Sequence, residues 1–292
     1  METASYNIND ETLHYWFFKG PKNGPILHWA HANGFNGPTY YNLLSELSNF
    51  CNIYAWDARS HGMNLNLRKP ASGRIFAQCT SDLIQFTNYL YEKHKKRIIL
   101  AGHSFGATLC IKAENSLRDE VSKILLADPV LFTRFHAAAS NLLRAFKFKH
   151  PKELYLAEYA AKRRNKWQNT AQAVANLSEK SLFKNWDKLS LQNYVTYGTN
   201  SIDGHIKLNC SPNIEAQIFK ESEREFLSKQ IINLSTETHL FLAAKGSPAF
   251  AKNSFKKSAR TLSQSIIEDS NHSFPIEKYR EFGKVMLEKI LL

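Results

Sequence analysis

The sequence predicts an α/β protein with a doubly wound, mostly parallel sheet and an inserted helical cap. Short runs of Ile, Leu, Val and Ala alternate along the chain with stretches whose apolar residues recur every three or four positions. Strands that are apolar throughout are typical of parallel sheets covered by helices on both faces. The alternation stops over residues 131–235 and then resumes, which indicates an insertion.

The expected elements follow one another in a regular order. Strands are predicted at residues 12–19, 25–31, 52–56, 97–102, 123–127, 239–244 and 264–267. Helices are predicted at residues 38–50, 75–90 and 105–117, near 250–262 and at 275–291. In the second helix, apolar residues lie 4, 4, 3 and 4 positions apart and so share one face: Ile75, Cys79, Leu83, Phe86 and Leu90. Residues 1–130 and 236–292 are thus predicted to form the core, and residues 131–235 the helical cap.

The composition is that of a globular protein. With 43% hydrophobic and 12% aromatic residues among 292, the chain can bury a large core, which excludes a disordered or fibrous protein. Its longest apolar runs are far shorter than the roughly 20 residues of a membrane-spanning helix, so no stable membrane insertion is expected. The N-terminal stretch has neither a basic opening nor an apolar segment, so no secretory signal is expected and the predicted location is cytoplasmic.

The net charge of +12 is unusual, and residues 131–235 carry +7 of it, from 16 basic against 9 acidic residues. No nucleic-acid-binding pattern accompanies the charge, so no nucleic-acid partner is expected. Either solvated helix faces or attraction of an acidic substrate or surface explains it. The four cysteines are scattered without a CxxC pair and are interpreted as reduced packing residues.

The strongest chemical signal is the sequence GHSFG at residues 102–106, where a buried strand is predicted to turn directly into a helix. Such a turn forces Ser104 into a strained conformation that exposes its hydroxyl, and the close helix requires small residues two positions before and after it. Gly102 and Gly106 meet that requirement. Ser104 is therefore the candidate nucleophile.

This arrangement resembles the α/β-hydrolase superfamily, and three further motifs extend the resemblance over nearly the whole chain. HANGF at residues 31–35 is similar to the family's oxyanion loop, DARSHG at 57–62 to its DxRGHG segment, and NHSFP at 271–275 to the loop of the catalytic histidine. With ADPVLF at 127–132 and NCSPNIEAQIF at 209–219, the chain further resembles a little-characterised bacterial subgroup with unassigned substrates.

The resemblance implies roles for individual residues. Ser104 is the expected nucleophile and His272 the expected general base. The oxyanion hole is expected to use the amide of Phe105 and one from the region of Asn33, although the extra residue in the HANGF loop leaves open whether Asn33 or Gly34 supplies it. The expected substrate contacts, beside these motifs, are Phe35, His103 and Leu131.

The acid is the main departure from the family pattern. In most members it follows the strand that here precedes residues 245–248, but no Asp or Glu occurs between residues 240 and 267. Asp128, after an earlier strand, keeps the order nucleophile, acid, base and is the predicted partner of His272. Asp269 is the alternative. A second departure is Ser60, which stands where glycine is usual, and the DARSHG segment is interpreted as structural.

The remaining histidines near the predicted sheet edge, His31, His61 and His103, occupy positions that the family uses for structural hydrogen bonds. No metal site is therefore predicted, and the resemblance implies no cofactor. The inserted cap is expected to cover the site and set substrate choice, since it begins directly after Asp128. Arg163 and Arg164 are expected to face water. The aromatic residues expected to be buried or to line an apolar pocket are Phe132, Phe135, Phe146, Phe148, Tyr155, Tyr159, Trp167 and Trp186.

Together these features predict a serine hydrolase that cleaves an ester or related acyl bond of a small apolar substrate through an acyl-enzyme. An acyltransferase, a hydrolase of carbon–carbon bonds and a non-catalytic binding protein on the same scaffold are the alternatives. The oligomeric state is not predicted.

Overall fold

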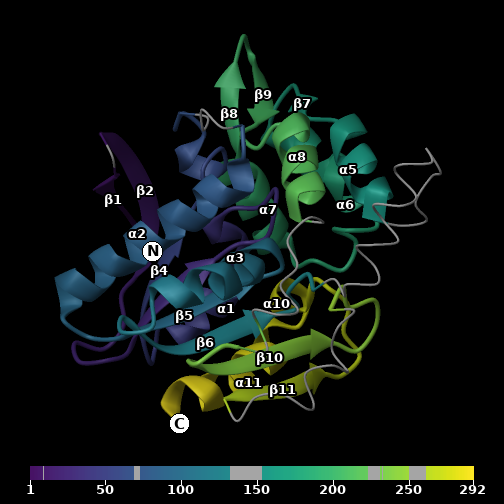
Figure 1. Cartoon of the computed structure of the whole chain (residues 1–292). Helices are drawn as coiled ribbons and strands as arrows, with labels where there is room; N and C mark the ends of the chain where they lie inside the picture. Colours follow the sequence, from purple (N-terminus) through teal and green to yellow (C-terminus); the bar gives the residue numbers. More distant parts are fainter. Residues whose placement is uncertain (9, 69–72, 132–152, 223–230, 232, 250–260) are drawn as a thin grey trace, which may run out of the picture.

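The computed structural model describes all residues except 9, 69–72, 132–152, 223–230, 232 and 250–260, and it describes residues 153–155 without their side chains. Its centre is a sheet with the strand order β1-β2-β4-β3-β5-β6-β10-β11 (Figure 1). The bounds of these strands are β1 (Glu2–Ile8), β2 (Glu11–Phe18), β3 (Ile26–Ala30), β4 (Asn52–Trp56), β5 (Ile98–His103), β6 (Val121–Ala127), β10 (Glu237–Ala243) and β11 (Leu262–Ile267).

The pairing is parallel from β4 through β11, and only β1 and β2 run antiparallel to their neighbours. Because β3, β5, β6 and β10 are buried on both faces along most of their length, their residues are mainly apolar, and the polar residues of β6 and β10 lie near the start of each strand. The predicted mostly parallel α/β fold is confirmed. The strand β1 was not predicted, although Ala4, Tyr6 and Ile8 alternate with polar residues, as in a strand with one exposed face.

Helices cover both faces of the sheet. They are α1 (Tyr41–Leu47), α2 (Ile75–His94), α3 (Phe105–Ala113), α10 (Phe274–Glu277) and α11 (Tyr279–Leu291). The apolar faces of α2 and α3 pack into one core cluster, and those of α1, α10 and α11 into another on the opposite face. Neighbouring strand residues alternate between the two clusters, as Ile98 and Ile99 do, so each parallel strand contributes to both.

Several predicted helices are divided. The first predicted helix begins as a short 3-10 turn at Gly37–Tyr40, and the third ends as one at Glu114–Ser116. The final helix is split into α10 and α11, with Lys278 between them in a non-helical conformation. The helix expected near residues 250–262 lies almost entirely outside the described residues.

The insertion is not purely helical. It contains α5 (Glu153–Lys162), β7 (Lys166–Trp167), α6 (Thr170–Ser178), α7 (Lys188–Gly198), β8 (Thr199–Ile202), β9 (His205–Leu208) and α8 (Pro212–Ser222). The three strands form a small antiparallel sheet of order β7-β9-β8, which the sequence analysis did not predict. In Figure 1 these teal and green elements lie together on one side of the core sheet.

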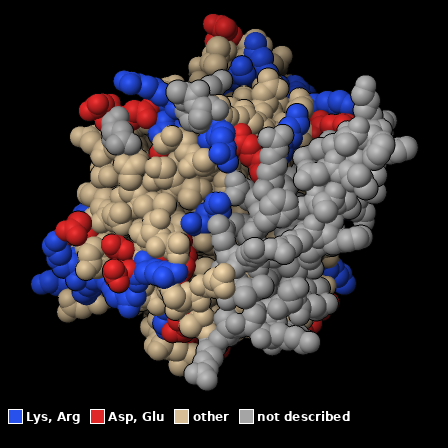
Figure 2. Space-filling view, viewed as in Figure 1, with Lys and Arg blue, Asp and Glu red and all other residues tan. Residues whose placement is uncertain are grey.

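Basic side chains do not gather into one continuous patch on the face seen in Figure 2. Over the described part of that face, Lys and Arg are scattered with acidic side chains among them. The four cysteines Cys51, Cys79, Cys110 and Cys210 are buried free thiols, as expected for packing residues. No helix in the described ranges is long and apolar enough to span a membrane.

Candidate active site

Ser104 lies at a sharp turn between β5 and α3. Its φ of 52° and ψ of −111° fall in a region that residues with a side chain rarely adopt. The backbone N–H of Ser104 donates to Ala127 O at 2.9 Å, which holds the turn against β6. A Cβ atom on Gly102 would lie 2.6 Å from the backbone of Gly106, and one on Gly106 would lie 2.2 Å from Ala30 O. Both glycines are therefore required for the helix to approach the sheet this closely.

The structure brings the side chains of Ser104, His272 and Asp128 together. His272 Nε2 is 2.9 Å from Ser104 Oγ, and His272 Nδ1 is 2.7 Å from Asp128 Oδ2. Because a carboxylate can only accept, His272 Nδ1 carries a proton that it donates to Asp128. In a neutral ring, Nε2 is then the acceptor for the Ser104 hydroxyl. This is the protonation state that a general base requires.

Asp128 directly follows β6 and is fully buried. Its φ of 46° turns the chain away from the strand, and its N–H donates to Phe241 O on the neighbouring β10 at 2.8 Å. Asp269, the alternative acid, has an exposed side chain, and the carboxylate that contacts His272 Nδ1 is that of Asp128. The geometry favours Asp128 because it follows the strand next to that of Ser104.

The backbone N–H groups of Asn33 and Gly34, the two candidates for the second amide of the oxyanion hole, differ in their hydrogen bonding. The N–H of Gly34 donates to His61 Nε2 at 3.0 Å and is therefore occupied. No acceptor among the described residues binds the N–H of Asn33 or of Phe105. Phe105 is the first residue of α3, where backbone N–H groups have no partner within the helix. The amides of Asn33 and Phe105 are thus free to bind a further acceptor.

His103 was expected to contact substrate, but both of its ring nitrogens are bound within the protein. Its Nε2–H donates to His272 O at 2.8 Å, and its Nδ1 accepts from Tyr40 OH at 2.7 Å. The Tyr40 oxygen in turn accepts from Ala32 N at 3.1 Å. Burial lowers the pKa of His103 well below its usual value, in agreement with a neutral ring. His103 therefore links the oxyanion loop to the backbone of His272, and Tyr40, which carries no motif signal, completes the link.

Leu131 and Phe35, the other two expected substrate contacts, are both buried but pack against different parts of the protein. Leu131 is fully buried and pairs with Ala249 beyond the ends of β6 and β10, so it serves in packing. Phe35 is largely buried and packs edge-on against Trp186 and Tyr194 of the insertion, with ring centroids 5.1 and 5.7 Å away. Of the three, Phe35 is the one in contact with the aromatic residues of the insertion.

His31 and His61 make structural hydrogen bonds. His31 Nε2 accepts from Ala58 N at 2.8 Å, and His61 Nδ1 donates to Arg59 O at 3.0 Å. Desolvation lowers the pKa of His31 to about 4 and that of His61 to about 3. Within the described ranges, no group of three or more potential ligand side chains could hold a metal ion.

The DARSHG segment supports the oxyanion loop. Buried Asp57 accepts hydrogen bonds from Gly37 N at 2.7 Å and Trp16 Nε1 at 3.0 Å. A Cβ atom on Gly62 would lie 2.1 Å from Asp57 Oδ2, so only glycine fits there. Ser60 has a φ of 66°, which explains why glycine is usual at this position.

Arg163 does not face water, contrary to the sequence-based expectation. Its Nη1 is 2.9 Å from Glu215 Oε2, and its Nη2 donates to Tyr194 OH at 2.8 Å. Burial raises the pKa of Glu215. The backbone O of Glu215 accepts from Asn33 Nδ2 at 3.0 Å, so this ion pair from α8 and the end of α5 lies directly behind the oxyanion loop. Glu215 lies in the NCSPNIEAQIF stretch at residues 209–219, but the sequence assigned it no role of its own.

The aromatic residues of the insertion divide into three groups. Trp167 and Trp186 are buried as expected, but Tyr159 is 68% exposed. The side chains of Phe132, Phe135, Phe146, Phe148 and Tyr155 lie outside the described residues. Exposed Arg164 does face water as expected.

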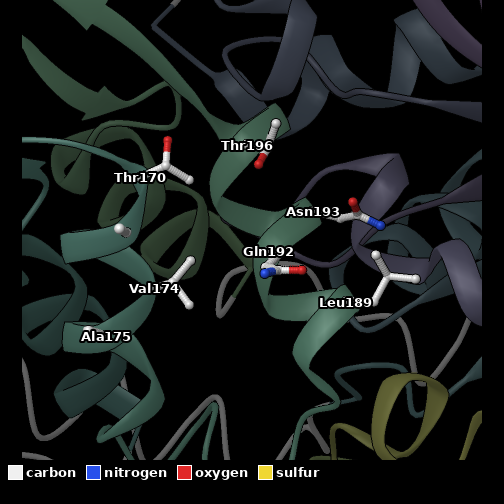
Figure 3. A pocket seen from close by; sticks show the side chains of 8 residues that line it. Thr170, Val174, Ala175, Leu189, Gln192, Asn193 and Thr196 are labelled. Atoms are coloured by element: carbon white, nitrogen blue, oxygen red, sulfur yellow. The ribbon is translucent and has the colours of Figure 1, made fainter.

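An open groove lies between α6 and α7 (Figure 3). Its lining residues are Thr170, Ala171, Val174, Ala175, Leu189, Gln192, Asn193 and Thr196. It contains no charged side chain and none of the motif residues. The candidate active site is therefore the cluster around Ser104.

Comparison with known proteins gives matches over most of this chain. A profile of the Alpha/beta hydrolase family matches residues 27–282. Protein phosphatase methylesterase 1 of Saccharomyces cerevisiae is 28% identical over 120 residues, a match that covers 37% of this chain and only 30% of that protein.

Two solved structures share the fold over nearly their whole length. E-2-(acetamidomethylene)succinate hydrolase has a TM-score of 0.79 at 18% identity, and the alignment covers 100% of this chain and 99% of the hydrolase chain. The thioesterase domain from the curacin biosynthetic pathway has a TM-score of 0.76 at 13% identity and covers 99% of each chain. With the profile match over residues 27–282, the chain belongs to the Alpha/beta hydrolase family.

Proposed function

We propose that this protein is a serine hydrolase that cleaves a carboxylic ester through an acyl-enzyme. The observation that carries the proposal is the continuous set of contacts from Ser104 Oγ through His272 to the buried carboxylate of Asp128, at 2.9 and 2.7 Å. The strained backbone of Ser104 and the free amides of Phe105 and Asn33 support the same chemistry.

The first half of the reaction forms the acyl-enzyme. His272 Nε2 takes the proton of Ser104 Oγ as that oxygen attacks the ester carbonyl carbon. The amides of Phe105 and Asn33 bind the oxygen of the tetrahedral intermediate, and Asp128 stabilises the imidazolium. His272 then gives its proton to the leaving alkoxide, and the alcohol departs.

The second half releases the acid. His272 Nε2 removes a proton from a water molecule, whose oxygen attacks the acyl carbon of the ester with Ser104. The oxyanion forms in the same hole. When it collapses, the bond to Ser104 Oγ breaks, and His272 returns its proton to that oxygen. No proton or electron is left over, and the chemistry needs no cofactor.

The acyl or alcohol group is proposed to be apolar. Phe35 is the last residue of the oxyanion loop and belongs to an aromatic cluster with Phe183, Trp186 and Tyr194 of the insertion. Aromatic and aliphatic walls favour apolar substrate groups. The described part of the insertion thus supports a cap over residues 131–235 that contributes to substrate choice.

Labelling with a fluorophosphonate tests the nucleophile, because this probe phosphonylates only activated serines. We expect mass spectrometry to locate one adduct on Ser104, and Ser104→Ala to lose both labelling and hydrolysis of p-nitrophenyl esters. An adduct elsewhere, or normal turnover by Ser104→Ala, contradicts the proposal. A thioester, an amide and an acyl-acceptor alcohol in the same panel separate ester hydrolysis from the other acyl reactions by their products.

A further inference from the structure

The loop after β10, residues 245–249, lies against the buried carboxylate of Asp128. Ser247 Oγ is 2.5 Å from Asp128 Oδ1. This is the oxygen that His272 does not use, since His272 Nδ1 binds Oδ2. The two oxygens of one carboxylate therefore have separate partners, and one of these comes from a loop that carries no acid of its own.

The direction of the hydrogen bond follows from the chemistry of a hydroxyl group. Ser247 has one hydroxyl proton, and a carboxylate oxygen can only accept it, so Ser247 is the donor. The Ser247 oxygen in turn accepts from Ala249 N at 3.3 Å. The other donor to Asp128 Oδ1, Ala243 N, is also 3.3 Å away. Ser247 thus makes the shorter of the two hydrogen bonds to this oxygen.

The loop that carries Ser247 is held to the segment after Asp128. Leu131 N donates to Pro248 O at 3.3 Å, and Leu131 pairs with Ala249 in an isolated parallel bridge. Asp128 and Ser247 follow β6 and β10, which are neighbours in the sheet. Ser247 therefore has a defined position relative to the carboxylate.

We propose that Ser247 is a positioning residue that holds the Asp128 carboxylate in the orientation that His272 requires. A fully buried carboxylate is stable only when donors bind its oxygens. Without the Ser247 hydroxyl, Oδ1 retains only the long contact to Ala243 N, and the carboxylate is free to rotate away from His272 Nδ1. The inference rests on the proposed function, because it assigns Ser247 a role through Asp128.

Removal of this hydroxyl tests the proposal. Ser247→Ala is expected to lower kcat by about 10- to 100-fold, as for one lost hydrogen bond to a charged group, with little change in KM. Ser247→Thr, which keeps the hydroxyl, is expected to recover most of the rate. Ser122→Ala is the matched control, since Ser122 lies at the other end of β6 and its hydroxyl donates to Ile98 O. Thermal unfolding of each variant monitors the fold.

A double-mutant cycle separates positioning of Asp128 from a general structural role. The rate of phosphonylation of Ser104, followed by mass spectrometry, remains measurable in slow variants. In an Asp128→Asn background we expect Ser247→Ala to change this rate by less than about 2-fold, because the residue through which it acts is gone. Equal losses in both backgrounds, or an unchanged kcat in Ser247→Ala, overturn the inference. The proposed function itself is overturned by different results, namely failure of Ser104 labelling in the wild-type protein or normal turnover by Ser104→Ala.

Discussion

Ser104 and Asp128 share a backbone feature that places their side chains at one edge of the sheet. Each directly follows a parallel strand, and each has a positive φ, of 52° and 46°. Such a conformation costs on the order of 1–3 kcal/mol for a residue other than glycine, so the surrounding structure must stabilise it. Hydrogen bonds from Ser104 N to Ala127 O and from Asp128 N to Phe241 O do so, because both connect the turn to the next strand.

Replacement of Asp128 tests which carboxylate orients His272. Asp128→Asn is expected to lower kcat by roughly 10⁴-fold while the melting temperature stays close to wild type, because the amide favours the wrong tautomer of the histidine. Asp269→Asn is the matched control and should retain nearly full activity, since that side chain is exposed. Steady-state ester hydrolysis by both variants checks this. The reverse pattern contradicts the assignment of Asp128.

The insertion is connected to the core by hydrogen bonds at the loops that form the site. Asn33 Nδ2 donates to Glu215 O of α8 at 3.0 Å, and Asn36 Nδ2 donates to Tyr194 O of α7 at 3.1 Å. A Cβ atom on Gly34 would lie only 3.0 Å from the carboxyl group of Glu215. The oxyanion loop is thus packed between the core and the two insertion helices.

The largely buried ion pair of Arg163 and Glu215 is expected to affect stability strongly when only one partner is removed. Arg163→Met leaves the Glu215 carboxylate buried without its cation and should lower the free energy of unfolding by about 3–5 kcal/mol. Arg164→Met, at the exposed neighbouring position, should lower it by less than about 1 kcal/mol. Urea denaturation at pH 7.5 measures both. Equal effects of the two substitutions would show that the ion pair is unimportant.

Trp186 provides a test of whether the insertion sets substrate choice. Trp186→Ala removes the ring that packs against Phe35, and it should raise kcat/KM for longer acyl groups relative to short ones by about 10-fold. Trp167→Ala removes an equally large buried ring of the insertion that has no ring contact with Phe35, so it should lower stability without a change in preference. A series of p-nitrophenyl esters of increasing chain length measures this. An unchanged preference in Trp186→Ala would assign the insertion to packing alone.

The molecule as a whole contains several buried neutral histidines, and these make its stability depend on pH. Desolvation lowers the pKa of His28 and His61 to about 3 and that of His31 and His239 to about 4, from the usual 6.5. The unfolded chain therefore takes up protons below pH 6.5 that the folded protein does not bind until pH 3–4. Stability is present above pH 6.5 and is lost as the pH falls through this window.

We expect each of these histidines to contribute a loss of about 1.4 kcal/mol per pH unit between pH 6.5 and about 4. Burial raises the pKa of Asp57 and Glu215, which offsets part of the loss. The melting temperature should therefore be clearly lower at pH 5 than at pH 7.5 and should recover when the pH is restored. Equal melting temperatures at the two pH values would contradict this account.

Local pattern in the amino-acid sequence was enough to predict the parallel core. Its strands are continuous apolar runs and its helices repeat with a helical period, so each element is specified by a few neighbouring residues. Ser104 was predicted from the strand-to-helix turn of GHSFG, whereas His272 and Asp128 were implied by the resemblance to the α/β-hydrolase superfamily, and the structure brings the three side chains together. Strand β1 was not predicted despite its alternation of apolar and polar residues. The short strands of the insertion were not predicted, since their pairing partners stabilise them more than their own sequences do.

Some residues have a role that depends on a contact with a residue distant in sequence. Only the folded protein reveals them, because no local sequence pattern marks them. Ser247 and Tyr40 are single polar residues, and the sheet order and close packing bring them to Asp128 and His103. The sequence places Arg163 beside exposed Arg164, yet only the packing of α5 against α8 supplies Glu215 as its buried partner. The physical reason is that strand and helix periods act over a few residues, whereas a hydrogen bond or ion pair forms between groups that only the tertiary structure brings within about 3 Å of each other.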